Sequence, residues 1–280
     1  MKMKKRMKWI ATTLSVLTMA VSAEEEVLWK LDGSNADFSN KHSTKAWFAT
    51  KDPVPSVVKT QDGGFIINNH TSRYLSLKPD TWLVFELVKA ERRDAKKYTS
   101  WSIHCFDKNY VGSIVGNIGQ IPIGLYTIQI TGLEKPIWTA LRFYDYNLDL
   151  TFRYIKLVKD PENSLGAEVP KGKKLLYPGD KFTIVLTLKD PCEDVTCKLM
   201  HDVGRGARPF SVNGTDTVEL KPVDKDGRIW KSEITLKNFA QQKKPLNARS
   251  VRIKATVLGG KLETPIYGVI PAGFRMEEEK

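Results

Sequence analysis

The sequence contains few of the residues from which catalytic and metal sites are usually built. Its 280 residues include three cysteines and four histidines. It lacks a Gly-x-Ser-x-Gly nucleophile motif, a His-Glu-x-x-His zinc motif and a phosphate-binding glycine-lysine loop. Asp145 and Asp149 are close in sequence, but nothing places them across a cleft, as a glycosidase would require. We therefore predict that the protein is not an enzyme and needs no cofactor, with a structural calcium ion at Asp32 left open.

Long apolar runs are also missing, except near the N-terminus. Five basic residues within the first eight positions precede an apolar segment over 9–21, which ends at Val21 and is followed by Ser22 and Ala23. A basic head, a short apolar middle and small residues at −3 and −1 are typical of a secretory signal peptide. We expect a signal peptide over 1–23, cleaved after Ala23, and a bacterial protein that is periplasmic or secreted. An uncleaved N-terminal anchor is the alternative, and we expect no transmembrane segment in the mature chain.

Basic residues outnumber acidic ones, but they are dispersed. The formal net charge is +12, and without the five basic residues of the leader 39 basic residues face 32 acidic ones. Such an excess of positive charge can favour binding of anionic glycans or cell-wall polymers through long-range attraction. The alternative is that the charges only keep a surface of mixed sign soluble. The charged segment 91–97 is interpreted as a solvated loop, with a polyanion patch as the alternative. We predict no nucleic-acid partner.

Sustained helical periodicity is absent, and period-2 alternation takes its place. Apolar and polar residues alternate over 101–105, 126–130, 182–188, 230–237 and 251–257. This alternation is typical of strands with one buried and one wet face, as in antiparallel sheets. Asn213-Gly214 and Asp226-Gly227 supply the turn residues that tight hairpins need. The predicted fold class is therefore all-β, with two β-sandwich domains.

The most aromatic run in the sequence, 141–158, is expected to end the first domain as a long strand or a strand pair. Its apolar parity runs through Leu150, Phe152 and Tyr154 and then shifts to Ile155 and Leu157. Such a shift indicates a β-bulge or a strand that passes from one sheet to another. A segment rich in Pro, Glu, Asn, Ser and Gly follows, and we interpret 162–174 as a linker.

The three cysteines are interpreted as one loop disulfide and one free thiol. Cys192 and Cys197 lie between two strand-like runs, and export makes a disulfide between them feasible. A metal site is the weaker alternative, because only His201 is close in sequence. Cys105 lies in an apolar run and is expected to be a buried free thiol, with neighbouring His104 on the opposite face of the same strand.

Two resemblances refine the fold. Residues 24–161 resemble the galactose-binding-like jelly roll of many carbohydrate-binding modules, through the opening Asp32-Gly33-Ser34, the strand 82–87 and the closing strand 152–158. Residues 175–275 resemble an immunoglobulin-like or fibronectin-type sandwich, through the run 178–184 and the strand around Trp230. A charged tail follows over 276–280. The first resemblance implies a binding site of aromatic residues beside polar groups, on a sheet face or at loop tips.

A glycan site needs aromatic rings for the apolar face of a sugar and polar groups for its hydroxyls. The residues that meet this description are Arg142, Tyr144, Asp145, Tyr146, Trp47, Asn69 and His70. We expect an exported non-catalytic protein that binds carbohydrate or a cell-envelope polymer. The alternatives are core aromatics plus a polar turn, which would suit a structural or adhesive protein with protein partners, and an accessory part of a glycan-degrading enzyme system.

Overall fold

A computed structural model describes the chain in twelve stretches. These are residues 25–32, 57–67, 72–78, 80–97, 100–106, 111–115, 123–130, 136–168, 180–203, 206–209, 217–235 and 251–270. Within them the backbone forms strands and turns and no helix, so no helix of this part could span a bilayer. The expected all-β fold class is confirmed. The predicted signal peptide over 1–23 and the charged tail over 276–280 lie outside the described residues.

Nineteen strands account for most of the described chain. The first ten are β1 (Glu26–Asp32), β2 (Val57–Lys59), β3 (Phe65–Ile67), β4 (Ser72–Leu77), β5 (Trp82–Arg92), β6 (Ser100–Phe106), β7 (Val111–Val115), β8 (Gly124–Gln129), β9 (Ile137–Tyr146) and β10 (Leu148–Lys159). The others are β11 (Ser164–Glu168), β12 (Lys181–Thr187), β13 (Asp194–Val203), β14 (Gly206–Pro209), β15 (Thr217–Glu219), β16 (Lys221–Pro222), β17 (Ile229–Thr235), β18 (Val251–Leu258) and β19 (Ile266–Ile270).

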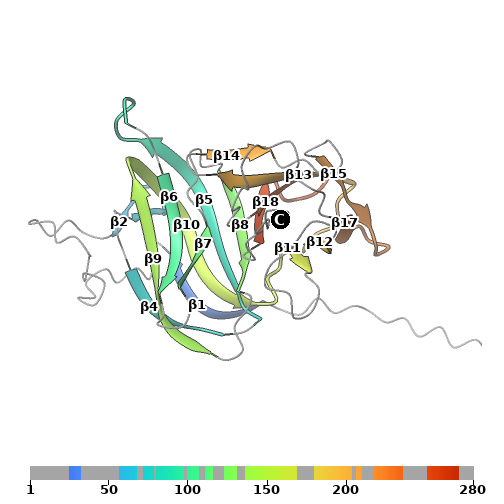
Figure 1. The fold of residues 1–280 in the computed structure, drawn as a ribbon, viewed down its shortest axis with the longest axis horizontal. Helices are drawn as coiled ribbons and strands as arrows, with labels where there is room; N and C mark the ends of the chain where they lie inside the picture. Colours follow the sequence, from blue (N-terminus) through green and yellow to red (C-terminus); the bar gives the residue numbers. More distant parts are fainter. Residues whose placement is uncertain are drawn as a thin grey trace, which may run out of the picture.

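These strands form one large sheet and two small ones (Figure 1). The large sheet has eleven strands in the order β14-β13-β18-β19-β8-β5-β10-β3-β2, with β1 also paired to β10 and β15 to β13. One four-stranded sheet has the order β4-β9-β6-β7, and the other has the order β11-β12-β17-β16. Adjacent described strands pair antiparallel, except that β19 pairs parallel with β8. The large sheet therefore contains strands from both halves of the chain.

An aromatic layer covers one face of the large sheet. Its rings come from five adjacent strands and are Phe65, Phe152, Phe85, Tyr126 and Tyr267. Ring centroids of Phe85 and Tyr126 lie 4.7 Å apart, and those of Tyr126 and Tyr267 lie 4.8 Å apart. Stacked rings at such distances add to the free energy of burying their apolar area. Leu77 of β4 is fully buried in the same core, so the sheet of β4, β9, β6 and β7 packs over this layer.

A second core fills the space between the large sheet and the sheet of β11, β12, β17 and β16. Strict alternation along β12 buries Phe182, Ile184 and Leu186, as the sequence pattern predicted. They pack with Trp230 of β17 and with inward residues of β13, β18 and β19. Val84, Leu125 and Val158 from the first half of the chain belong to this core as well. The arrangement is thus two sandwiches that share the large sheet.

The two halves meet along β8, β19 and β11. The Leu165 N–H donates to Thr127 Oγ1 at 2.9 Å, and both residues are fully buried. A Cβ at Gly268 would lie 2.1 Å from the Leu165 carbonyl oxygen, so the close approach of β19 to β11 requires glycine there. Strand β11 lies inside the predicted linker, 162–174. Residues 164–168 are instead a strand that pairs with β12.

The aromatic run 141–158 forms a pair of strands in different sheets. β9 belongs to the four-stranded sheet of β4, β6 and β7, whereas β10 belongs to the large sheet. The register of β10 against β5 shifts between Thr151 and Phe152 and again between Phe152 and Tyr154. These shifts explain why the buried positions change from Phe152 to Ile155, and they confirm the irregularity that the parity of the sequence predicted.

Replacing Thr127 with valine tests the junction between the two halves. Thr127→Val keeps the shape but removes the acceptor of the buried Leu165 N–H, so we expect a loss of about 1–3 kcal/mol of unfolding free energy. Thr127→Ser keeps the hydroxyl and should lose only about 1 kcal/mol, the value of one buried methyl group. Equilibrium urea denaturation measures both. A valine variant as stable as the natural protein would contradict the proposed role of this hydrogen bond.

Candidate functional site

Strand β9 carries four of the predicted ligand residues: Arg142, Tyr144, Asp145 and Tyr146. It lies between β4 and β6 in the four-stranded sheet, with β7 beyond β6 (Figure 1). The other predicted ligand residues, Trp47, Asn69 and His70, lie outside the described residues. The side chains of the four β9 residues also lie outside the described part, so the register of the strands places these positions.

The burial of β4 identifies the outer face of this sheet. Leu77 is fully buried in the aromatic core, and its neighbour Ser76 is exposed. Alternate positions of a strand share a face, and so do positions that are paired across neighbouring strands. The positions related to Ser76 in these two ways therefore belong to the outer face. Ser76 pairs with Trp138 of β9. The even-numbered positions of β9, including Arg142, Tyr144 and Tyr146, therefore share the outer face.

Pairing across the sheet extends this face into rows. One row runs over all four strands and consists of Ser72, Arg142, His104 and Ser113. Tyr144 pairs with Ser102, and Tyr146 pairs with Ser100. The residue types at these paired positions, Ser, His, Arg and Tyr, are ones from which stacking surfaces and hydrogen-bonding sites are built.

Asp145 is separated from the other three residues. It pairs with Trp101 and has the parity of Phe143 and Leu141, which belongs to the face toward the core. In the sequence, Asp145 stands among Arg142, Tyr144 and Tyr146 and looks like part of one cluster. The alternation over 101–105 is the signal that places His104 with the polar positions of β6. Ser72 and Ser113 had no distinguishing signal, because only strand pairing brings them into the row.

Asn147 closes the turn between β9 and β10 and fixes the end of the site. It has a positive φ of 58°, which a short polar side chain tolerates better than most. Its amide nitrogen donates to the carbonyl oxygens of Asp94 and Lys97 at 2.7 and 3.1 Å. Its amide oxygen accepts from the Asp94 N–H at 2.8 Å. The turn therefore holds the charged loop 93–97 against the end of β9.

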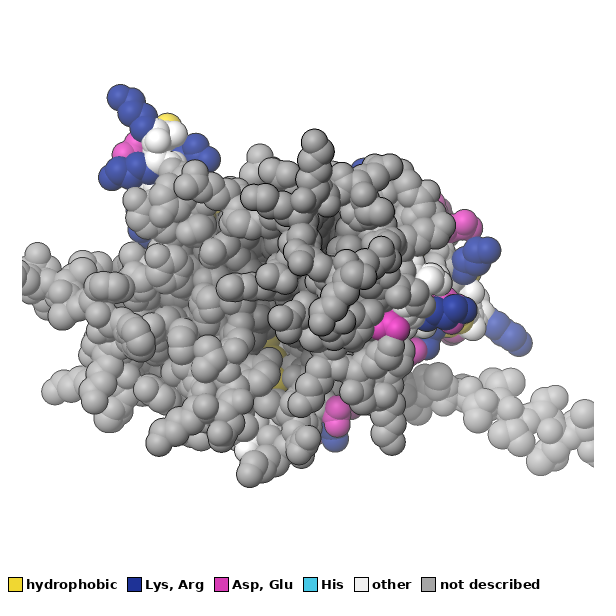
Figure 2. All heavy atoms as spheres, viewed as in Figure 1, with side chains coloured by type: hydrophobic (Ala, Val, Ile, Leu, Met, Phe, Trp, Pro, Cys, Tyr) yellow, Lys and Arg dark blue, Asp and Glu magenta, His cyan; other side chains and the backbone are white. Residues whose placement is uncertain are grey.

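The charged side chains around this loop pair with one another. Arg93 Nε lies 2.7 Å from an oxygen of Asp149, and Lys89 Nζ lies 3.0 Å from an oxygen of Glu91. Figure 2 shows basic and acidic side chains close together at this end of β5, at the upper left. Exposed pairs of this kind contribute at most about 1 kcal/mol each. The loop matches the interpretation as a solvated segment of mixed charge.

The predicted disulfide between Cys192 and Cys197 is not formed, and both thiols are free. Cys197 lies in β13, which begins at Asp194, and Cys192 precedes that strand. Cys192 Sγ instead lies 3.7 Å from the Gly227 carbonyl oxygen. Burial raises the pKa of both thiols, to about 12 for Cys197, so neither is a ready nucleophile.

Metal ligands do not cluster in the part of the chain that the structure describes. No group of three or more His, Cys, Asp or Glu side chains there is placed to hold an ion. Asp32, at which a calcium ion was left open, has an oxygen 2.9 Å from Lys30 Nζ. A cation at Asp32 would therefore have to compete with an ammonium group.

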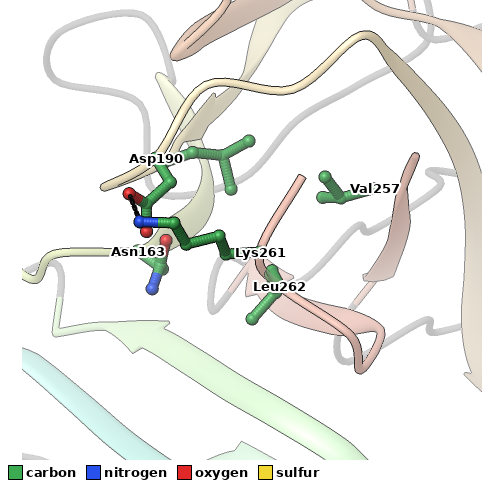
Figure 3. A pocket seen from close by; sticks show the side chains of 6 residues that line it. Asn163, Asp190, Val257, Lys261 and Leu262 are labelled. Atoms are coloured by element: carbon green, nitrogen blue, oxygen red, sulfur yellow. Dashed lines mark hydrogen bonds and ion pairs between the residues drawn. The ribbon is translucent and has the colours of Figure 1, made fainter. Parts of the chain in front are cut away.

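A small pocket lies near the turn between β18 and β19. Its volume is about 80 Å³, and it is lined by Asn163, Leu188, Asp190, Val257, Lys261 and Leu262 (Figure 3). Lys261 Nζ lies 3.0 Å from Asp190 Oδ1, and this pair forms one wall. Pockets that enclose small-molecule ligands usually measure about 300–1,000 Å³. The pocket is thus too small to enclose a sugar substrate.

Two substitutions at Asn147 separate its backbone role from its side-chain role. Asn147→Gly keeps the positive φ accessible but removes three hydrogen bonds, so we expect a loss of about 1–3 kcal/mol. Asn147→Ala should lose about 1 kcal/mol more, because alanine is strained in the left-handed region. Urea denaturation gives both values, and trypsin should cleave faster after Lys96 and Lys97 in both variants. Unchanged stability and cleavage would contradict the role assigned to Asn147.

Comparison with known proteins found weak structural likeness alone. No family model matches the sequence, and no curated protein matches it. A DUF4785 family protein from Legionella pneumophila is 11% identical, with a TM-score of 0.25, and the match covers 82% of this chain and 71% of that one. The glycoside hydrolase domain of Endo-D from Streptococcus pneumoniae R6 is 9% identical, with a TM-score of 0.20, covering 74% of this chain and 33% of that one. The description as an all-β sandwich therefore rests on this chain's own strand order and cores.

Proposed function

We propose that this chain is an exported, non-catalytic binding protein that recognises carbohydrate or a cell-envelope polymer. Binding takes place on the outer face of the sheet of β4, β9, β6 and β7, by aromatic stacking and hydrogen bonding. In this proposal, residues 24–161 act as a galactose-binding-like module, and residues 175–275 act as an immunoglobulin-like or fibronectin-like module. The protein works in the periplasm or outside the cell, with the polymer as its partner.

The observation that carries the proposal is the register of β9. It assigns Arg142, Tyr144 and Tyr146 to one face and pairs them with His104, Ser102 and Ser100. A sugar ring offers an apolar C–H face that stacks on an aromatic ring, while its hydroxyls need donors and acceptors at the rim. Tyr144 and Tyr146 are two residues apart on β9, and polar positions of β6 are paired with them. Such a row can supply stacking and hydrogen bonding to successive sugar units of a polymer.

Several features favour binding without turnover. Hydrolysis of a glycosidic bond needs two carboxylates facing each other across a cleft. Of the two carboxylates that are close in sequence, Asp145 has the parity of the core-facing positions, and Asp149 pairs with Arg93. The pocket beside Lys261 is small. A sheet face suits an extended polymer that is held and released.

Truncating the two tyrosines tests the proposed binding face. Tyr144→Ala and Tyr146→Ala should each weaken polysaccharide binding roughly tenfold, because each removes an aromatic stacking surface worth about 1.5 kcal/mol. The measurement is binding of the mature protein to an array of plant, microbial and envelope polysaccharides, followed by titration with the best ligand. Tyr154→Ala, which changes a half-buried tyrosine of the large sheet, serves as the control and should bind like the natural protein.

Two outcomes would overturn the proposal. One is that no polysaccharide is retained while a pull-down recovers a protein partner, which would favour the structural or adhesive alternative. The other is that both tyrosine variants bind as tightly as the natural protein. Release of reducing sugars from any polysaccharide by the purified protein would contradict the non-catalytic part.

A further inference from the structure

We propose that the outer face of β4, β9, β6 and β7 takes a polysaccharide whose sugars carry carboxylates, that is, a polymer of uronic acids. This inference rests on the proposed function and specifies its ligand. It follows from the charge of the positions that share the face, together with the place of Arg142 among them.

The outer-face positions within the described strands carry basic groups and no acidic one. By strand pairing they are Ser72, Tyr74, Ser76, Ser100, Ser102, His104, Phe106, Val111, Ser113, Trp138, Ala140, Arg142, Tyr144 and Tyr146. Arg142 and His104 are directly paired on the two central strands, β9 and β6, so the basic positions lie in the middle of the sheet rather than on an edge strand. A neutral glycan gains little from such an arrangement, whereas an anionic one is attracted and oriented by it.

The residue types at and near position 142 suit a uronic acid. A guanidinium group forms paired, charge-assisted hydrogen bonds with a carboxylate. Tyr144 is two positions away on the same strand, roughly 6.7 Å along it. A uronic acid residue has an apolar ring face for the tyrosine and a carboxylate at the ring edge for the arginine. Both contacts can therefore be made by one sugar unit or by adjacent units.

The small number of basic positions argues against a ligand that is bound by charge alone. Proteins that bind nucleic acids neutralise several phosphates, and the logarithm of the affinity falls by about 0.7–0.9 per contact for each tenfold rise in salt. With Arg142 and His104 as the basic positions of the face, at most about two such contacts are available here. The aromatic positions Tyr74, Trp138, Tyr144 and Tyr146 outnumber them. Stacking should supply much of the affinity, and the carboxylate contact should supply the selectivity.

The test compares polygalacturonate with the same polymer after chemical reduction of its carboxyl groups to alcohols. Both polymers keep the ring and the linkage, so the difference in binding reports the carboxylates. The full mature protein should bind polygalacturonate at least tenfold more tightly than the reduced polymer. Arg142→Gln should abolish this preference, and Arg142→Lys should retain part of it. Arg153→Gln, which changes an exposed strand arginine of the large sheet, is the matched control and should keep the full preference.

The outcomes separate this inference from the proposed function. Equal binding of both polymers, or an Arg142→Gln variant that keeps the preference, would overturn the uronic acid assignment while carbohydrate binding stands. Binding of dextran sulfate as tightly as polygalacturonate, with a salt dependence steeper than about two charges, would overturn it in favour of general attraction to polyanions. If neither these polymers nor any polysaccharide of the wider array binds, the proposed function itself fails.

Discussion

The burial of one aromatic layer sets the orientation of the whole molecule. Phe65, Phe152, Phe85, Tyr126 and Tyr267 form a continuous set of ring contacts over five strands of the large sheet. Leaving such an area exposed to water would cost several kcal/mol, so a second sheet must cover it. The sheet of β4, β9, β6 and β7 does so, as the burial of its Leu77 records. Its opposite face is then necessarily the outer one, and the proposed site lies there.

Tyr267 also shows why the two halves of the chain cannot be treated separately. It comes from β19, near the end of the described chain, and stacks on Tyr126 of β8. The parallel pairing of β8 with β19 joins the first half of the chain to the second within one sheet. The buried hydrogen bond between Thr127 and Leu165 satisfies a backbone donor that would otherwise be stranded at this junction. The second half thus completes the core of the first, and it also carries its own core.

Local patterns in the sequence predicted the parts of the fold that local forces determine. The alternation over 182–188 predicted β12 and its buried face, and the parity shift after Phe152 predicted the irregularity of β10. Long-range pairings had no such signal, because nothing near Ile266 indicates a parallel partner 141 residues earlier, at Leu125. Strand β11 was missed because its composition resembles that of a linker, and the cysteine spacing suggested a disulfide that is not formed. At the site, alternation along β9 separates Tyr144 from Asp145, although the two residues are neighbours in the sequence.

The central claim is that alternate positions of β9 face outward and inward, and thiol labelling tests it most directly. Tyr144→Cys and Phe143→Cys each introduce a cysteine into the tryptic peptide 143–153, which contains no natural cysteine. In the folded protein, Tyr144→Cys should react with a water-soluble maleimide like an exposed thiol. Phe143→Cys should react at least about 100-fold more slowly, because it needs local opening of the sandwich, and urea should remove the difference. Equal rates in the folded protein, or faster labelling at position 143, would contradict the account.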